Sequence, residues 1–178
     1  MTVRRITEIG NPVLRVSSMS VAEDDFGTDP LLGFVQDLVD TMRDYDGVGI
    51  AAPQVGVPAR IFAIEVRAAD EARDAEPFPL TVVMNPELEL YEDRVHPGWE
   101  GCLSIDGLRG VVPRARHARL TGRSVTGEAI DVELVGFPAV VAQHEFDHLD
   151  GVVYLDRMPD LLSLATVREL ARRTTAPD

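Results

Sequence analysis

Apolar residues recur at helical spacing in the first quarter of the chain. The stripe consists of Leu31, Phe34, Val35, Leu38, Val39, Met42 and Tyr45. Positions three and four apart share one face of a helix, so this spacing predicts a helix with one buried side. Asp29 and Pro30 supply an N-cap and a first-turn proline, and Gly47 supplies a stop. The polar residues 24–29 predict a loop before it.

The middle of the chain favours β-strands. Short runs of β-branched and other apolar residues, punctuated by Gly and Pro, are typical of strands. The candidates are residues 60–66, 80–84, 88–91, 110–112, 118–120 and 129–135. The stretch 68–79, which is rich in Asp, Glu, Ala and Pro, predicts a surface loop.

Two more helices are predicted after the strands. Pro138 can open a helix that runs to about Asp150, with Gly151 as its stop. The last helix is expected over residues 161–173. Strands in the middle with an N-terminal and a C-terminal helix indicate an α+β fold and not alternating β–α units. The 178 residues suit a single domain spanning 1–178.

Composition and charge exclude several classes of protein. The formal net charge of −13 opposes binding to DNA, RNA or an anionic lipid surface. No apolar run approaches the ~20 residues that cross a bilayer, and no apolar segment follows Arg4 and Arg5 as in a secretory signal. Cys102 is the only cysteine, so an intramolecular disulfide is impossible, as suits a reducing compartment.

The chemistry is concentrated in one five-residue segment, His144-Glu145-Phe146-Asp147-His148, which reads HExxH. Residues four apart lie on one face of a helix, so the two imidazoles can close on a single metal ion. Glu145 can then reach a water held by that ion. Two of the four histidines fall in this segment, which follows the apolar run 139–142. Both features favour metal binding over two unrelated surface histidines.

A catalytic centre of this kind needs a third protein ligand. The HExxHxxGxxH pattern fails, because Tyr154 stands where its last histidine should be. A peptidase-like centre could instead use Glu169, although the arginines around it suggest a solvated helix face. Upstream, Cys102 offers a thiolate beside Gly101, and thiolates are good ligands for zinc and ferrous iron. Cys102, His144 and His148 would leave one position open for water.

Three segments together resemble one family. Residues 47–54 read GVGIAAPQ and resemble the GxGLAAPQ motif of peptide deformylases, with Ile50 in place of the usual leucine. Residues 100–104 read EGCLS and match a second motif. Residues 143–151 read QHEFDHLDG and are similar to a third, QHExDHLxG. The order and approximate spacing also agree, and the resemblance spans nearly the whole chain.

The resemblance implies an α+β fold with antiparallel β-sheets packed around a central HExxH helix. It also implies Cys102, His144 and His148 as metal ligands, with Fe(II) as the native metal and zinc, nickel or cobalt able to replace it. Glu145 would be the general base. The Gln54 side chain and the Leu103 backbone N–H would stabilise the oxyanion.

The implied reaction is removal of the N-formyl group from formyl-methionine at the N-terminus of newly made polypeptides, with release of formate. Glu100 beside an apolar site needs a cation, and Arg114 is the candidate. The residues expected to bind substrate are Val48, Gly49, Glu100, Arg109, Phe137, Val140 and Val141, with Trp99 at the rim.

The expected partners are N-formylmethionyl nascent peptides. The protein itself is expected to be a monomer in the cytoplasm. Arg168, Arg172 and Arg173 on the last helix suggest a ribosome contact, with a solvated helix end as the alternative. Two other functions stay open at this stage. One is an HExxH peptidase that uses Glu169, and the other is a family member that binds metal or formyl-peptides without catalysis.

Overall fold

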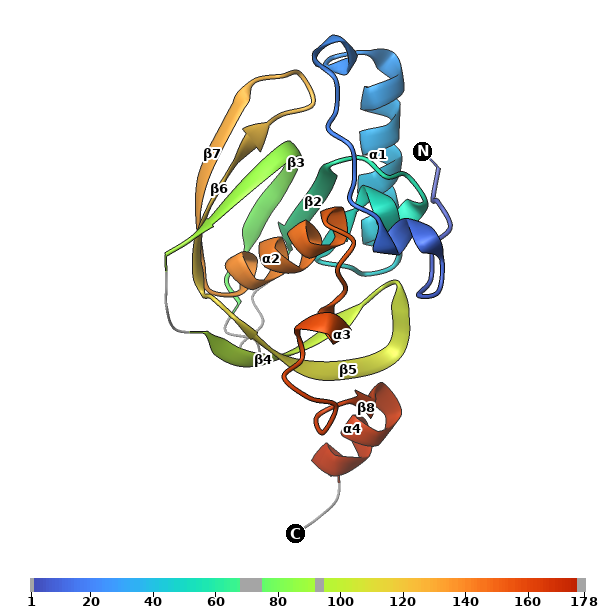
Figure 1. Ribbon diagram of the computed structural model, residues 1–178, viewed down its shortest axis with the longest axis vertical. Coiled ribbons are helices and arrows are strands. Elements are labelled where there is room, and N and C mark those ends of the chain that lie inside the picture. The colour runs from blue at the N-terminus through green and yellow to red at the C-terminus, as the bar shows by residue number, and fades with distance from the viewer. Residues whose placement is uncertain (1, 68–74, 92–94, 176–178) are drawn as a thin grey trace.

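The computed structural model describes residues 2–67, 75–91 and 95–175. Figure 1 shows a curved sheet, a long helix on each of its two faces, and a smaller sheet below that carries the C-terminal segment. The helices are α1 (Asp29–Asp44), α2 (Phe137–Leu149), α3 (Tyr154–Arg157) and α4 (Val167–Thr175). Three short 3₁₀ helices are η1 (Pro12–Arg15), η2 (Glu23–Asp25) and η3 (Ala52–Val55).

Within the described part of the chain, eight strands form two antiparallel sheets. The larger sheet has the order β1-β2-β3-β6-β7, and the smaller has the order β4-β5-β8. The strands are β1 (Gly49–Ala51), β2 (Ile61–Val66), β3 (Phe78–Leu90), β4 (His96–Cys102), β5 (Ile105–Arg114), β6 (His117–Arg123), β7 (Ala129–Val135) and β8 (Ala165–Thr166). The predicted α+β fold with antiparallel sheets is confirmed.

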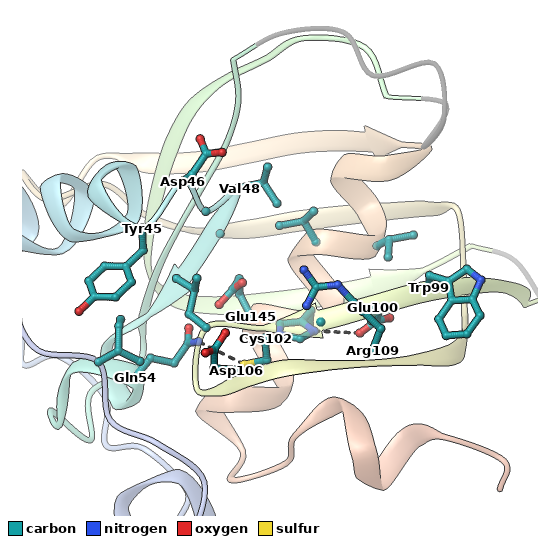
Figure 2. A pocket seen from close by; sticks show the side chains of 18 of the residues that line it. Tyr45, Asp46, Val48, Gln54, Trp99, Glu100, Cys102, Asp106, Arg109 and Glu145 are labelled. Atoms are coloured by element: carbon teal, nitrogen blue, oxygen red, sulfur yellow. Dashed lines mark hydrogen bonds and ion pairs between the residues drawn. The ribbon is translucent and has the colours of Figure 1, made fainter. Parts of the chain in front are cut away.

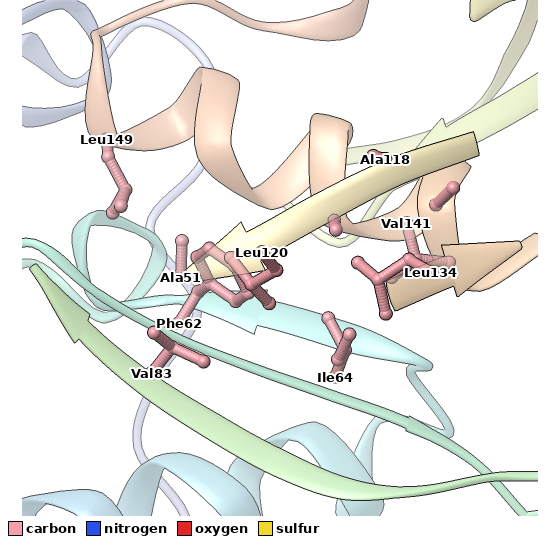
Figure 3. Close-up of a cluster of buried hydrophobic side chains, with 11 residues drawn as sticks. Ala51, Phe62, Ile64, Val83, Ala118, Leu120, Leu134, Val141 and Leu149 are labelled. Carbon is pink, nitrogen blue, oxygen red and sulfur yellow. The ribbon is translucent and has the colours of Figure 1, made fainter. Parts of the chain in front are cut away.

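Strand β2 explains why two helices can pack on one sheet. Successive side chains of a strand point to opposite faces. Phe62 and Ile64 therefore join a core with α2, while Ile61 and Ala63 join a second core with α1. All four are buried, so β2 is apolar on both faces and its sequence is a nearly continuous apolar run. Figure 3 shows the first of these cores, with Phe62 and Ile64 beside Leu120 and Leu134.

Helix α2 lies at the centre of the molecule, on the curved sheet (Figure 1). Its contacts with strands run across the sheet from β1 to β7. Most of its residues are buried. The predicted bounds hold to one residue at the start, and Gly151, with φ 74°, follows the helix end as predicted. The HExxH segment is thereby fixed on a rigid, central element.

The first helix differs from its prediction at both ends. The N-cap is Thr28 and not Asp29, which is the first helical residue. The helix ends at Asp44, because Asp46 with φ 52° has already left the helical conformation before Gly47. The polar segment before the helix includes η2.

Two predicted strands are one, and three strands, β1, β4 and β8, were not predicted. Residues 80–84 and 88–90 belong to the single strand β3, because Asn85 adopts φ 48° in a register shift and the strand continues past Pro86 to Leu90, one residue short of the prediction. Strand β4 was missed because Pro97 and Gly98 near its start are typical of a turn. The predicted loop 68–79 lies partly outside the described residues, and its last two residues begin β3.

The C-terminal helix is shorter than predicted and begins at Val167. The segment before it is extended instead, because Ala165 and Thr166 pair with β5. The Ser163 hydroxyl accepts a hydrogen bond from the Val111 backbone N–H at 3.0 Å. Thr166 Oγ1 then accepts the Glu169 backbone N–H at 3.2 Å, which caps the new helix start.

Candidate metal centre and active site

The two histidines of the HExxH segment meet the only cysteine. The ligand atoms of Cys102, His144 and His148 lie within 4.8 Å of one another. Cys102 Sγ is 3.2 Å from His148 Nε2. The sulfur comes from the end of β4, and both rings come from α2, one turn apart. One sulfur and two ring nitrogens at this separation fit a single divalent ion with one position left for water.

The second nitrogen of His144 has its own partner. His144 Nδ1 lies 2.8 Å from Glu100 Oε2. A ring that donates its Nδ1 proton to a carboxylate presents the lone pair of Nε2 to a metal, and this arrangement is common at metal-binding histidines. Burial opposes ionisation of Glu100, but the hydrogen bonds from His144 and Arg114 outweigh it, so its pKa lies below the ordinary value.

Glu145 lies beside these ligands with little solvent. Its side chain is buried, and burial raises its pKa to about 7, with the charge of Glu100 acting in the same direction. Among the described residues, Glu145 Oε2 has no hydrogen-bond partner. A carboxylate with this pKa and a free oxygen is suited to taking and returning a proton near neutral pH.

Gly49 makes room for Glu145. A Cβ at position 49 would lie 2.4 Å from Glu145 Oε1 and 2.8 Å from Val141 Cγ1. Strand β1 can therefore approach α2 this closely only because residue 49 has no side chain. The closest neighbour of Gly49 is thus the Glu145 carboxylate itself.

Gln54 is fixed at the other side of the ligands. It lies in η3, and its Oε1 accepts the Ala51 backbone N–H at 2.8 Å. This bond sets the orientation of the amide, so Nε2 faces the thiol and donates to Cys102 Sγ at 3.4 Å. The Gln54 amide is therefore held in one orientation, with its Nε2 directed at the Cys102 sulfur.

These groups border a cavity of about 600 Å³. Figure 2 shows Gln54, Glu145 and Cys102 converging in it, with Trp99 at the opposite end from Gln54 and Tyr45. The sequence-predicted residues that line it are Val48, Gly49, Gln54, Glu100, Cys102, Leu103, Arg109, Phe137, Val140, Val141, His144 and Glu145. His148 is fully buried behind Cys102 and does not line the cavity.

Two edge strands form opposite walls of this cavity, and α2 also contributes to its lining. Strand β1 ends the larger sheet, and β4 ends the smaller one. Gly49 of β1 and Gly101 of β4 both line the space between them. At Gly101 a Cβ would lie 1.8 Å from Arg109 Nη1, so the guanidinium of Arg109 rests directly on this glycine. Arg109 is thereby placed at the cavity.

Glu169 lies elsewhere. Its Oε2 accepts a hydrogen bond from Arg172 Nη1 at 3.0 Å on the exposed helix α4. This is the solvated pairing that its arginine neighbours suggested, and Glu169 is not part of the Cys102–His144–His148 group. The structure gives no support to a peptidase centre that uses Glu169.

Sequence reasoning missed two residues of the HExxH neighbourhood. Gln143 binds the turn between β5 and β6, because its amide contacts both the N–H and the carbonyl of Ala115 at 3.2 Å and 2.7 Å. Asp147 is buried and accepts hydrogen bonds from Arg114 and Arg157. The position of Asp147, three residues after His144 and on a buried helix, was the signal that it needed a cation.

Comparison with known proteins agrees with this geometry. A family model described as polypeptide deformylase matches residues 3–163. The chain belongs to the polypeptide deformylase family. Peptide deformylase 1 of Nitrosomonas europaea is 41% identical over 159 residues, which cover 89% of each chain. Peptide deformylase 1 of Prochlorococcus marinus is 40% identical and covers 96% of this chain and 88% of its own.

Solved deformylase structures share the fold. A class I type b peptide deformylase from Acinetobacter baumannii, with Met-Ala-Ser bound, has a TM-score of 0.84 at 31% identity. The match covers 88% of this chain and 99% of that one. The enzyme from Thermotoga maritima has a TM-score of 0.79 at 33% identity and covers 90% and 100%. As a deformylase family member, this chain is a hydrolase with a group able to hold a metal.

Proposed function

We propose that this chain removes the N-formyl group from formyl-methionyl peptides as they emerge from synthesis, and releases formate. The observation that carries the proposal is the meeting of Cys102, His144 and His148 with Glu145 beside them, inside a cavity between two edge strands. Membership of the deformylase family supports it. The Met-Ala-Ser ligand of the Acinetobacter relative has the sequence that a deformylated peptide would have.

We assign Cys102, His144 and His148 as the metal ligands and Fe(II) as the native ion, with zinc, nickel or cobalt as substitutes. A thiolate with two imidazoles suits these ions better than magnesium or calcium, which prefer oxygen ligands. A divalent ion held there would acidify a water and polarise the formyl oxygen. Metal analysis of protein purified without oxygen would identify the ion.

The chain's own groups perform the remaining steps. Glu145 takes a proton from the attacking water as the new C–O bond forms at the formyl carbon. The Gln54 amide and the Leu103 backbone N–H donate to the oxygen on which negative charge develops. The C–N bond then breaks, Glu145 delivers its proton to the departing amine, and formate and a free N-terminus remain.

The peptide substrate would lie extended between β1 and β4. Both are edge strands, and an edge strand offers unpaired backbone groups to an added strand. Gly49 and Glu100 lie on these strands, and Arg109 rests on β4. The methionine side chain would enter the apolar part of the cavity, which is lined by Val48, Phe137, Val140 and Val141.

Formate and free amine released from formyl-Met-Ala-Ser by anaerobic, Fe(II)-loaded protein would test this function. We expect Glu145→Gln to lower turnover by about 10²–10⁴-fold while the metal stays bound, because proton transfer alone is lost. Glu169→Gln should behave as wild type. Cleavage of an internal peptide bond, or metal binding without any release, would contradict the proposal.

We also propose that the chain is one domain that acts as a monomer in the cytoplasm, where nascent peptides are made. Among the described residues, no helix is long and apolar enough to cross a membrane. Light scattering of the purified protein would test the monomer.

A ribosome contact through α4 is a separate proposal. Its support is the charge of Arg168, Arg172 and Arg173 on an otherwise acidic chain. Replacing all three by Gln should reduce co-sedimentation with ribosomes, while Arg119→Gln on β6 should not. Unchanged co-sedimentation of the triple variant would remove this proposal.

A further inference from the structure

A row of charged side chains runs from the surface of α3 to the metal-binding group. Its outer part is a two-point contact between Arg157 and Asp147. Arg157 Nη2 donates to Asp147 Oδ1 at 2.6 Å, and Arg157 Nε donates to Asp147 Oδ2 at 3.1 Å. The Arg157 side chain is 51% exposed and that of Asp147 only 8%. The contact therefore joins the surface to a buried carboxylate.

The inner part of the row reaches His144. Asp147 Oδ2 also accepts Arg114 Nη1 at 2.7 Å. Arg114 in turn donates from Nε to Glu100 Oε1 at 2.8 Å and from Nη2 to Glu100 Oε2 at 3.2 Å. Glu100 Oε2 is the atom that lies 2.8 Å from His144 Nδ1. Four side chains thus stand in line behind one ligand ring.

The charges of the buried side chains in this row indicate a role for Arg157. Asp147, Glu100 and Arg114 are all buried, and together they carry two negative charges and one positive charge. Arg157 supplies the second positive charge and fills the remaining oxygen of Asp147. Without it, a buried carboxylate oxygen would lose its partner, which is costly. Arg114 would then be drawn toward Asp147 and away from Glu100.

We propose that Arg157 is a positioning residue for His144, acting through Asp147, Arg114 and Glu100. This inference rests on the proposed metal centre. Arg157 touches neither the ligand group nor the cavity, so its effect passes through the orientation of Glu100. Glu100 fixes the ring of His144 and thereby the direction of its Nε2 lone pair.

Cobalt(II) offers a readout that does not depend on activity. Its visible absorption reports ligand geometry, and its loss to excess EDTA gives the rate of metal release. Mutation of a direct hydrogen-bond partner of a metal ligand typically costs about 10–100-fold in affinity. Because Arg157 acts through three intermediates, we expect Arg157→Gln to speed release by roughly threefold to tenfold and to shift the cobalt band. Arg157→Lys, which keeps the charge but not the two-point contact, should fall between.

Arg43 provides a matched control. It makes the same kind of two-point contact with Glu65, at 2.8 Å and 2.7 Å. Arg43 is 41% exposed and Glu65 only 12% exposed, and neither lines the cavity. Arg43→Gln should therefore release cobalt at the wild-type rate, even if it lowers the melting temperature as much as Arg157→Gln does.

The outcomes distinguish failure of the role given to Arg157 from failure of the metal centre. Faster release in Arg157→Gln than in Arg43→Gln, with partial rescue by Lys, supports the inference. Equal release rates and equal cobalt bands overturn it, whatever happens to thermal stability, while the wild-type centre still stands. A wild-type protein that takes up no cobalt would overturn the metal centre itself and this inference with it.

Discussion

At the scale of single residues, the site depends on what is missing from Gly49 as much as on the ligands. The absence of a Cβ lets strand β1 lie against Glu145 and Val141. Any side chain at this position must displace the carboxylate that serves as the general base in the proposed function. Position 49 therefore couples the geometry of β1 directly to proton transfer.

Gly49→Ala is expected to lower turnover by about 10²-fold or more, on the order of a general-base contribution. The added methyl group would push Glu145 Oε1 away from its place, since their separation would be only 2.4 Å. Kinetics with formyl-Met-Ala-Ser and metal analysis of the same sample would show activity lost and metal retained.

Gly33→Ala is the control for this substitution. Gly33 lies in helix α1, and a Cβ there meets nothing within 4 Å. Replacing a helical glycine by alanine typically stabilises a protein by about 0.5–1 kcal/mol. The control should melt slightly higher and keep full activity. Full activity in Gly49→Ala would show that Glu145 can move without loss of function.

Individual residues also show which contacts the sequence can predict and which it cannot. The Cys102–His144–His148 group and the placement of Glu145 could be predicted, because helical spacing and three ordered motifs specify them. The contacts of Asp147 with Arg157 and of His144 with Glu100 could not. They join residues that are 10 and 44 positions apart, and only the folded backbone brings those side chains together.

At the scale of elements, helix α2 is tied to the sheet by a side chain as well as by its apolar face. The Gln143 amide pairs with the backbone N–H and carbonyl of Ala115, and it also donates to Ala139 O at 2.8 Å. All of these groups are buried. The amide therefore replaces a backbone partner for the turn between β5 and β6, which leads from the β4–β5 hairpin into the larger sheet.

Gln143→Ala should destabilise the protein by about 1–3 kcal/mol, because it leaves buried backbone groups of Ala115 unpaired. Gln36→Ala on α1 is the matched control, since its amide only bonds Asp40 at the exposed surface. Its expected cost is within about 0.5 kcal/mol. Urea denaturation of both variants would compare them, and equal stability would refute the role given to Gln143.

Helices and strands were predicted best where a single local sequence pattern determines them. Helix α2 and strand β7 were placed within one residue, because a bounded apolar run and a clean alternation leave few choices. Strand β4 and the start of α4 were misjudged. In both, pairing with β5 overrides the local preference of the sequence, and pairing between distant segments cannot be seen in a local window.

At the scale of the whole molecule, the proposed metal centre is a cross-link between the two sheets. Cys102 belongs to the smaller sheet, and the two histidines belong to the helix that packs on the larger one. A bound ion would therefore hold the sheets together by three protein ligands. This follows from the topology and could not have been predicted while β4 was missing from the sequence interpretation.

Metal removal should lower the melting temperature by about 5–15 °C, given the stabilisation that a ligand provides at 100–1,000 times its dissociation constant. Hydrogen exchange should rise most in β4 and β5, which lose the link through the ion and keep only the contacts of Glu100 with His144 and of Arg114 with Asp147. Calorimetry with and without EDTA would measure the first effect. Zinc added back should restore the original value, and Cys102→Ser should show a much smaller response to EDTA. If EDTA does not change the melting temperature of the wild type, the ion has no structural role.

The single thiol of the chain has a practical consequence. Since Cys102 is the only cysteine of the chain and is buried in the ligand group, every thiol equivalent titrated by a colorimetric reagent comes from this one atom. Ion-loaded molecules should react slowly and stripped molecules faster. The amplitude of the fast phase then counts the inactive fraction of any preparation, with no background from other thiols.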